Sequence, residues 1–342
     1  MTTQTLNETL PAEGRVGLVA LAALVGETLR EWTDGEALDV LAGGLLAEVR
    51  AAGGSLWVDL TAPDSGQVER VADLLGLHPL IAEDIVEGNQ RPKLEATDDL
   101  VHIVLFALEF NDDVHTHEID LVLGDGFLLS AHPAGWNPRT GNHFRGGLAA
   151  LLRSGPDHLL WAVADEIVDA YFPFADQLEE AIDALQDAVM RRTDRTTLAR
   201  VFELKRQLIE VRRAISPVRE VLNQLTNRDL ALIDAAELLY FRDVYDHVIR
   251  LTDELDNDRE LVTATLDVYL SQVNNNLSAI MKRLTGVTVI IAGIGAIAGI
   301  FGMSEAGLAF SGGEALGFWA VAIATIAVSF LVAAALHRIG WI

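Results

Sequence analysis

Two long runs without a charged side chain lie near the C-terminal end of the chain. The first covers residues 284–304 and the second covers residues 315–336. At a rise of about 1.5 Å per residue in an α-helix, each run is about 30 Å long, which matches the hydrocarbon thickness of a bilayer. A buried helical hairpin is the alternative, but core helices seldom remain uncharged over this length. The pattern therefore predicts two membrane-spanning helices joined by a short polar loop.

Basic side chains next to these runs predict their orientation. Lys282 and Arg283 precede the first run, His337 and Arg338 follow the second, and the loop between the runs contains no Lys or Arg. Because basic residues are enriched on the cytoplasmic side of membrane helices, we expect both termini in the cytoplasm. The first ten residues contain no basic side chain and no long apolar core, so no signal peptide is expected. A multi-pass protein of the plasma (inner) membrane is predicted.

The N-terminal part, residues 1–160, mixes short apolar runs with turn residues. Strands are expected at 55–60, 101–110, 118–123 and 127–131, with a hairpin turn at Gly124–Gly126, and helices at 35–50 and 64–75. The pattern predicts an α/β domain of mixed strand pairing. His115 and His117 are expected in a solvated loop before a strand, because no third ligand lies nearby in the sequence.

Residues 161–283 show helical periodicity and no strand pattern. Pro217 and the segment 226–229 are the expected interruptions, whereas residues 231–283 contain neither Pro nor Gly. One very long helix is therefore predicted to continue directly into the first membrane run. Because so long a helix is unstable alone, we expect partner copies of the chain. The predicted domains are residues 1–160, the long-helix region 161–283 and the membrane domain 284–342.

Charge and composition limit the possible functions. The chain has 342 residues, with 25 Lys and Arg against 50 Asp and Glu, a formal net charge of −25. This balance argues against a nucleic-acid partner, which requires a basic surface. The absence of cysteine excludes disulfides, thiolate zinc ligands and cysteine nucleophiles. Only Glu305, Glu314 and Arg338 carry a formal charge after residue 286, so an acidic soluble body precedes the membrane domain.

Short motifs follow one another in a fixed order along most of the chain. They are His78–Ile85, Gln90–Lys93, Tyr240–His247, Leu266–Leu270, Asn274–Asn276, Met281–Thr285, Gly299–Met303 and Gly340–Ile342. Each motif alone is weakly specific, but their order and spacing together are highly specific. On these residues the chain resembles the CorA family of divalent-cation transporters over nearly its full length.

The resemblance implies a homopentameric funnel. Each subunit would contribute an α/β cytoplasmic domain, long helices and two C-terminal transmembrane helices, of which the first lines a central pore and the second faces membrane lipid. One motif departs from the family, which has Gly-Met-Asn where this chain has Gly302, Met303 and Ser304. In the family the Asn ring presents amide oxygens to a hydrated cation. A ring of Ser304 hydroxyls can also accept hydrogen bonds from metal-bound water, but with a shorter reach.

The candidate pore residues lie along the first span and the helix before it. The entrance is assigned to Gly302, Met303 and Ser304, and the pathway to Gly299 and Ala292. Met281 and Leu284 match the family's hydrophobic gate, because rings of apolar side chains close a narrow pore by excluding water. Ser278 and Asp267 lie further toward the cytoplasm, where a ring of five Asp267 carboxylates concentrates cations.

Regulatory metal sites follow from the resemblance alone. In the family, Mg²⁺ bound between neighbouring cytoplasmic domains holds the channel shut when internal Mg²⁺ is plentiful. The matching positions are Asp84 and Asp243, with Glu83 and Asp165 as a second site. Carboxylates suit a hard cation such as Mg²⁺, and one ligand from each of two subunits couples metal binding to the interface. Taken without the motifs, Asp84 and Asp243 are interpreted as surface acids.

The preferred hypothesis is a passive Mg²⁺ channel, with Co²⁺ and Ni²⁺ as further cations. A Zn²⁺ transporter of the same superfamily is the first alternative. A non-conducting metal sensor, which keeps the regulatory sites and has lost the entrance motif, is the second. The sequence contains no catalytic triad, phosphate-binding loop or metal-hydrolase motif, so an enzyme is not expected.

Overall fold

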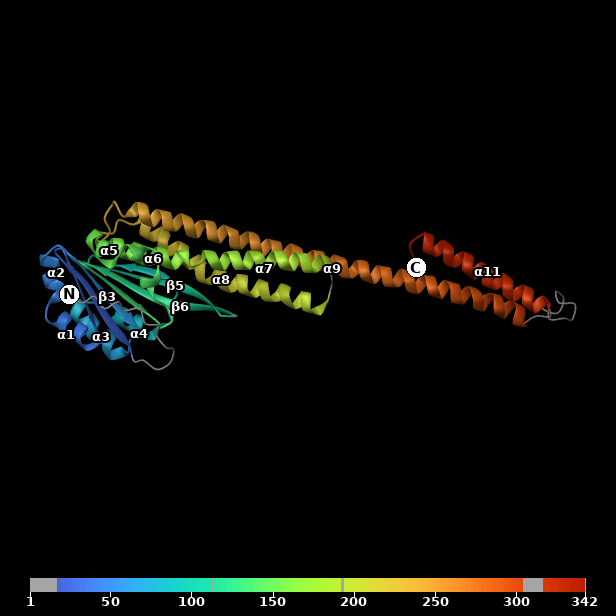
Figure 1. Cartoon of the computed structure of the whole chain (residues 1–342), viewed down its shortest axis with the longest axis horizontal. Coiled ribbons are helices and arrows are strands. Elements are labelled where there is room, and N and C mark those ends of the chain that lie inside the picture. The colour runs from blue at the N-terminus through green and yellow to red at the C-terminus, as the bar shows by residue number, and fades with distance from the viewer. Residues whose placement is uncertain (1–16, 112, 192–193, 304–315, 342) are drawn as a thin grey trace. The chain divides into compact units, whose positions relative to one another are not determined.

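A computed structural model describes residues 17–111, 113–191, 194–303 and 316–341 (Figure 1). The chain divides into two compact units. The first comprises Met1–Ala184 and Phe202–Val262, and the second comprises Leu185–Val201 and Thr263–Ile342. The first unit contains the sheet described below. The second contains the last part of the longest helix.

A seven-stranded mixed sheet forms the centre of the first unit, with strand order β2-β1-β3-β7-β6-β5-β4. The strands are β1 Leu18–Val25, β2 Thr28–Thr33, β3 Ser55–Thr61, β4 Lys93–Ala96, β5 Leu100–Asn111, β6 Asp113–Gly124 and β7 Phe127–His132. Only β3 and β7 pair in parallel; the other neighbours are antiparallel. Gly126 has φ +74° in the turn between β6 and β7, which glycine adopts without steric cost.

Helices cover both faces of this sheet (Figure 1). One face carries α1 Asp34–Ala42, α2 Leu45–Ala51, α3 Ser65–Leu75 and α4 Pro79–Glu87. Their apolar side chains share a core with alternate residues of β3 and β7, among them Leu56, Val58, Phe127 and Leu129. The other face carries α5 Leu148–Ser154 and α6 Pro156–Asp169, reached through the short 3-10 helices Pro138–Thr140 and His143–Gly146.

Four long helices follow: α7 Phe172–Arg191, α8 Arg195–Asn227, α9 Leu238–Met303 and α11 Leu316–Arg338. The first unit contains the beginning of α7 and of α9 and most of α8. Their buried apolar side chains, such as Ile182, Val218 and Phe241, recur at helical spacing. Arg212 on α8 forms an ion pair with Asp256 on α9 at 2.8 Å.

The predicted long helix is confirmed, because α9 is one unbroken helix of 66 residues. By length and composition, α9 is the one helix among the described residues that could cross a membrane. The described apolar part of α11, Ala322–Arg338, is shorter, so the second membrane span stays a prediction. All four predicted strands are present, and the helix expected at 64–75 is α3, with Asp64 as its N-cap.

Three local predictions are wrong. The helix expected at 35–50 is two helices, because Gly43 ends α1 and Gly44 adopts φ +94° before α2. Pro217 does not interrupt α8, since buried neighbours such as Ile215 and Val218 hold the helix in place on both sides of it. The segment with His115 and His117 belongs to β6 rather than to a loop.

Asp258 on α9 is a buried acid, with only 8% of its surface exposed. Burial, together with the negative charges of Glu179, Glu254 and Asp183, raises its pKa to about 6. Because the folded state favours the protonated acid, folding becomes less stable as the pH rises from about 4 through about 6.

We therefore expect Asp258→Asn to stabilise the folded domain above pH 7, with the difference vanishing below about pH 4. The measurement is the thermal unfolding midpoint of the purified chain in detergent, followed by near-ultraviolet circular dichroism from pH 4 to pH 8. The exposed Asp253 on the same helix provides the control substitution, Asp253→Asn. A stabilisation of Asp258→Asn that is the same at every pH would contradict this interpretation.

Candidate cation sites

The candidate pore residues that the structure describes share one side of α9. At about 100° per residue, five of those from Asp267 to Gly299 fall within an arc of about 60°. These five are Asp267, Ser278, Met281, Ala292 and Gly299. Leu284 and Gly302 lie about 60° beyond the edge of this arc by the same helical arithmetic. The arc, called the pore face below, therefore combines small, polar and apolar residues in a single line along the helix.

The pore face is uncovered within one chain. Asp267, Ser278, Ala292 and Gly299 are all exposed, and Met281 is 60% exposed. Apolar side chains elsewhere on this part of α9, such as Ile280 and Ile291, are equally open. Because a large exposed apolar surface marks contact with lipid or with another protein, this part of α9 requires such surroundings. Gly302 and Met303 form the end of α9, and Ser304 lies outside the described residues.

A cluster of acids and histidines lies between α6 and α9, in the first unit. Asp165 and Asp169 stand one turn apart on α6, and Asp243 and His247 stand one turn apart on α9. His247 Nδ1 lies 3.9 Å from Asp165 Oδ1 and 3.8 Å from Asp169 Oδ1. His247 Nε2 lies 3.9 Å from Asp243 Oδ2. His143 Nε2 is hydrogen-bonded to the other carboxylate oxygen, Asp165 Oδ2, at 2.6 Å.

This α6–α9 cluster has unused ligand atoms. Asp165 Oδ1 and His247 Nδ1 are buried and have no hydrogen-bond partner. The distances from His247 Nδ1 to the Asp165 and Asp169 oxygens are too long for hydrogen bonds. They are close to the spacing of about 3–4 Å that ligands adopt around one divalent ion with bonds of about 2.0–2.5 Å. Asp165, Asp169 and His247 are therefore placed to share a cation.

The charge of Asp165 is incompletely balanced in this cluster. Burial raises the pKa of the Asp165 carboxyl group, and the neighbouring Asp169 raises it further. The hydrogen bond and charge of His143, and more weakly His247, act in the opposite direction. The net effect is a raised pKa, so the ionised form of Asp165 lacks a sufficient positive partner. A bound dication would supply the missing charge.

Asp84 and Glu83 lie on α4, whose ends are fixed by the sequence. Pro79 occupies the first turn, the His78 side chain accepts a hydrogen bond from the Leu80 N–H, and Gly88 adopts φ +55° beyond the end. Glu83 is exposed. Asp84 is half-buried and pairs with Lys93 Nζ at 2.5 Å. Burial lowers the pKa of Lys93, but the hydrogen bond and charge of Asp84 outweigh it, so the pKa is raised.

Within the described part of one chain, the expected regulatory acids belong to separate groups. Asp243 and Asp165 come together in the α6–α9 cluster, joined through His247. Asp84 belongs instead to a group with Glu95 and His102. The pairing of Asp84 with Asp243, and of Glu83 with Asp165, was expected between subunits and stays a prediction.

Sequence reasoning missed several residues of these groups. His247 was noted only as the end of a motif, and Asp169, His143, Glu95 and His102 were not considered. Asp165 and Asp169 at helical spacing i, i+4, like Asp243 and His247, were the available signal, since such pairs share a helix face. Nothing in the sequence indicated that the two pairs face each other.

An acidic α/β domain joined by one unbroken helix to an exposed apolar stretch is the arrangement of a membrane protein, and the α6–α9 cluster adds groups that bind cations. The family model described as "CorA-like Mg2+ transporter protein" matches residues 52–338. The chain therefore belongs to the CorA-like family.

Individual relatives agree with this assignment. The cobalt/magnesium transport protein CorA of Thermotoga maritima is 34% identical over 259 residues, which cover 72% of each chain. The complete structure of the CorA magnesium transporter from Methanocaldococcus jannaschii has a similar fold, with a TM-score of 0.76 at 22% identity, covering 97% of this chain and 100% of that one. The zinc transport protein ZntB of Yersinia pseudotuberculosis is 24% identical over 300 residues, which cover 84% of this chain and 87% of that protein.

Proposed function

We propose that this chain is the subunit of a homopentameric channel that admits Mg²⁺ passively through the inner membrane. The observation that carries the proposal is the pore face of α9, an unbroken and uncovered line from Asp267 to Gly299 in a chain of the CorA-like family. Five copies that bring this face to a common axis enclose a narrow pathway. Co²⁺ and Ni²⁺ are the expected further cations.

The pore face suits a hydrated cation. Mg²⁺ releases its water reluctantly, so a pathway lined by small side chains and oxygen acceptors passes it with its shell. Ala292 and Gly299 leave space, and the Ser304 hydroxyls contact the hydrated ion at the entrance. Rings of Met281 and Leu284 close the pathway by excluding water, with Ser278 below them. Five Asp267 carboxylates attract cations at the cytoplasmic end.

Inward movement needs no other energy source than the membrane potential. With both termini in the cytoplasm, Mg²⁺ enters down the potential, which contributes about 4.6 kcal/mol per dication at 100 mV. Helix α11 serves as the second span and separates the pore helices from lipid. Its apolar side chains, such as Ile326 and Phe330, are largely exposed in the single chain, which supports this role.

The cytoplasmic acids regulate the channel. Asp84 of one subunit and Asp243 of its neighbour bind Mg²⁺, and Glu83 and Asp165 form a second site. The α6–α9 cluster supports this assignment, because it already places Asp243 beside ligand atoms that lack partners. When internal Mg²⁺ is low the sites empty, the carboxylates repel one another, and the interfaces loosen.

Two alternatives have an observation of their own. The similarity to ZntB and the imidazole of His247 in the α6–α9 cluster favour a Zn²⁺ transporter, because imidazole is a preferred zinc ligand. Ser304 in place of the family's Asn favours a non-conducting sensor that keeps only the regulatory sites.

Flux into proteoliposomes distinguishes the three functions. We expect Mg²⁺ uptake that is driven by an inside-negative potential and inhibited by Mg²⁺ sealed inside the vesicles. The measurement uses a fluorescent Mg²⁺ indicator in the vesicles, with Co²⁺, Ni²⁺ and Zn²⁺ tested in parallel. Uptake of Zn²⁺ without Mg²⁺ would identify the zinc transporter. No flux of any cation, for the native chain and for Ser304→Asn, would identify the sensor.

Asp243→Ala tests the regulatory sites separately from conduction. We expect Mg²⁺ to protect the purified native pentamer from limited proteolysis, because bound Mg²⁺ holds neighbouring domains together. In Asp243→Ala, protection is expected to require about tenfold more Mg²⁺, since one carboxylate ligand is lost. Asp246→Ala is the matched control, because Asp246 is an exposed acid on the same helix outside the cluster. Equal cleavage of the native protein with and without Mg²⁺ would refute the regulatory assignment.

A further inference from the structure

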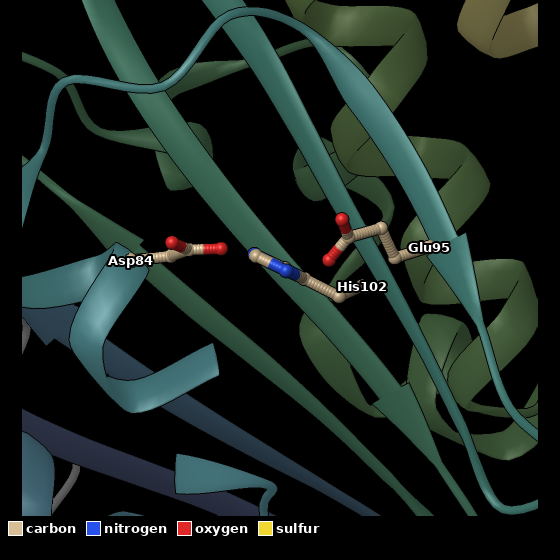
Figure 2. Close-up of side chains that lie close together, drawn as sticks. All are labelled: Asp84, Glu95 and His102. Carbon is tan, nitrogen blue, oxygen red and sulfur yellow. The ribbon is translucent and has the colours of Figure 1, made fainter. Parts of the chain in front are cut away.

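A second group of potential ligands lies beneath α4, on the face of the sheet that α4 covers. Glu95 on β4 and His102 on β5 are direct cross-strand partners. Asp84 reaches the same place from α4, and the imidazole of His102 lies between the two carboxyl groups (Figure 2). One ligand atom from each of the three residues lies within 4.8 Å of the other two. The three side chains thus converge from two strands and a helix.

The hydrogen bonds of His102 leave one nitrogen available. His102 is 0% exposed, and its Nε2 lies 2.8 Å from Asp120 Oδ1. A carboxylate can only accept a hydrogen bond, so Nε2 carries the proton and donates it. In the neutral imidazole Nδ1 then presents a lone pair, and this buried atom has no hydrogen-bond partner. A histidine held by a carboxylate with its second nitrogen free is the arrangement found at protein metal sites.

The charges of this group are unbalanced as well. Four acids, Asp84, Glu95, Glu118 and Asp120, lie around His102 on α4 and strands β4 and β6. Lys93 is the basic side chain among them, with its Nζ 2.5 Å from Asp84 and 3.3 Å from Glu95. The ammonium group contacts the two carboxylates that a metal would use. The Lys93 ammonium therefore supplies one positive charge at a position where the surrounding carboxylates favour a doubly charged cation.

We propose that Asp84, Glu95 and His102 form a binding site for a transition-metal dication such as Zn²⁺, Co²⁺ or Ni²⁺, which displaces the Lys93 ammonium. Asp120 is the positioning residue that orients the imidazole. One imidazole nitrogen with two carboxylates suits these metals, whereas Mg²⁺ prefers oxygen ligands and water. The ligands come from one chain, so the site does not rest on the proposed channel function.

The surroundings of the site allow a metal ion to enter from the solvent and allow the ligand side chains to move toward it. The Glu95 side chain is 59% exposed, so it can swing onto an ion, and the Asp84 and Lys93 side chains are each 20% exposed. His102 and Asp120 form the fixed inner wall, because both are buried in the sheet. Ligand atoms within 4.8 Å of one another need to approach by up to about 1.5 Å to reach the spacing of about 3.3 Å around a tetrahedral ion. Water from the solvent side completes the coordination.

Cobalt absorption tests the site in the full-length protein purified in detergent. Co²⁺ is titrated in the Asp243→Ala background, in which Asp84 has lost its proposed partner for Mg²⁺. Millimolar Mg²⁺ is present to occupy other all-oxygen sites, and the visible absorption band of nitrogen-ligated Co²⁺ is recorded. We expect one equivalent per chain to bind in this way, with Zn²⁺ competing and additional Mg²⁺ not competing. His247→Gln is included in the background of every variant, so that the α6–α9 cluster contributes no imidazole.

The Co²⁺ affinities of four variants distinguish a metal-binding site from a cluster of ion pairs that has only a structural role. Lys93→Met is expected to bind Co²⁺ about tenfold more tightly, because the competing ammonium is removed. Asp120→Asn is expected to bind about 10–100-fold more weakly, because the imidazole loses its orienting partner. His102→Gln should lose the band, whereas His115→Gln, an exposed histidine on β6, should keep it.

The proposal has clear negative outcomes. Unchanged Co²⁺ affinity in Lys93→Met together with Asp120→Asn would show that the group is a structural ion-pair cluster only. Displacement of Co²⁺ by an equal concentration of Mg²⁺ would overturn the assignment to transition metals. Because Lys93→Met removes no buried core group, it keeps the test decisive even where His102→Gln fails to fold. Neither result bears on cation flux, which the proteoliposome experiment measures.

Discussion

The rest of the structure depends on the two environments that α9 occupies along one unbroken length. Its first turns bury Phe241, Val244 and Val248 in the α/β unit, so that part is held by ordinary core packing. Beyond Leu277 the apolar side chains are mostly exposed, and nothing in the described chain covers them. A helix satisfies its own backbone hydrogen bonds, so this part is compatible with lipid but unfavourable in water. The same element that anchors the α/β domain therefore also requires lipid or another protein around its apolar part.

The second constraint is the charge of the α/β unit, because the negative charge of its carboxylates exceeds the positive charge of the nearby basic groups. In the α6–α9 cluster the result is a raised pKa for Asp165 and two buried ligand atoms without partners. Beneath α4, Lys93 neutralises part of the charge, and His102 is left with a free nitrogen. The α6–α9 cluster lies on α9 itself, where Asp243 and His247 precede the pore face along the same helix. A cation bound there would act directly on the element that forms the proposed pore.

Much of the fold could be predicted because it depends on local patterns. The uncharged run from residue 284 predicted the apolar C-terminal part of α9, and the absence of Pro and Gly from 231 to 283 predicted its continuity. Strands β1, β2 and β4 are absent from the sequence-based prediction, since β1 is a continuous apolar run without polar alternation and β4 is four residues long. The clusters could not be predicted at all. Glu95 and His102 meet through strand register, and Asp169 and His247 meet through helix packing, and neither relation leaves a local signal in the sequence.

The distribution of ligand types along the chain favours Mg²⁺ over Zn²⁺ as the transported ion. The chain has no cysteine, and no histidine occurs between His247 and His337. The pore face consequently offers oxygen atoms, backbone and the thioether of Met281, but no imidazole or thiolate that would hold a soft metal. The imidazoles lie instead in the α/β unit, at the α6–α9 cluster and beneath α4. A hard ion can pass such a pore with its water retained, whereas the pore face offers Zn²⁺ none of the imidazole that it prefers. On this reasoning, the proposed channel passes Mg²⁺, with Co²⁺ and Ni²⁺ in the same hydrated form, and Zn²⁺ is expected to bind at the imidazoles of the α/β unit instead.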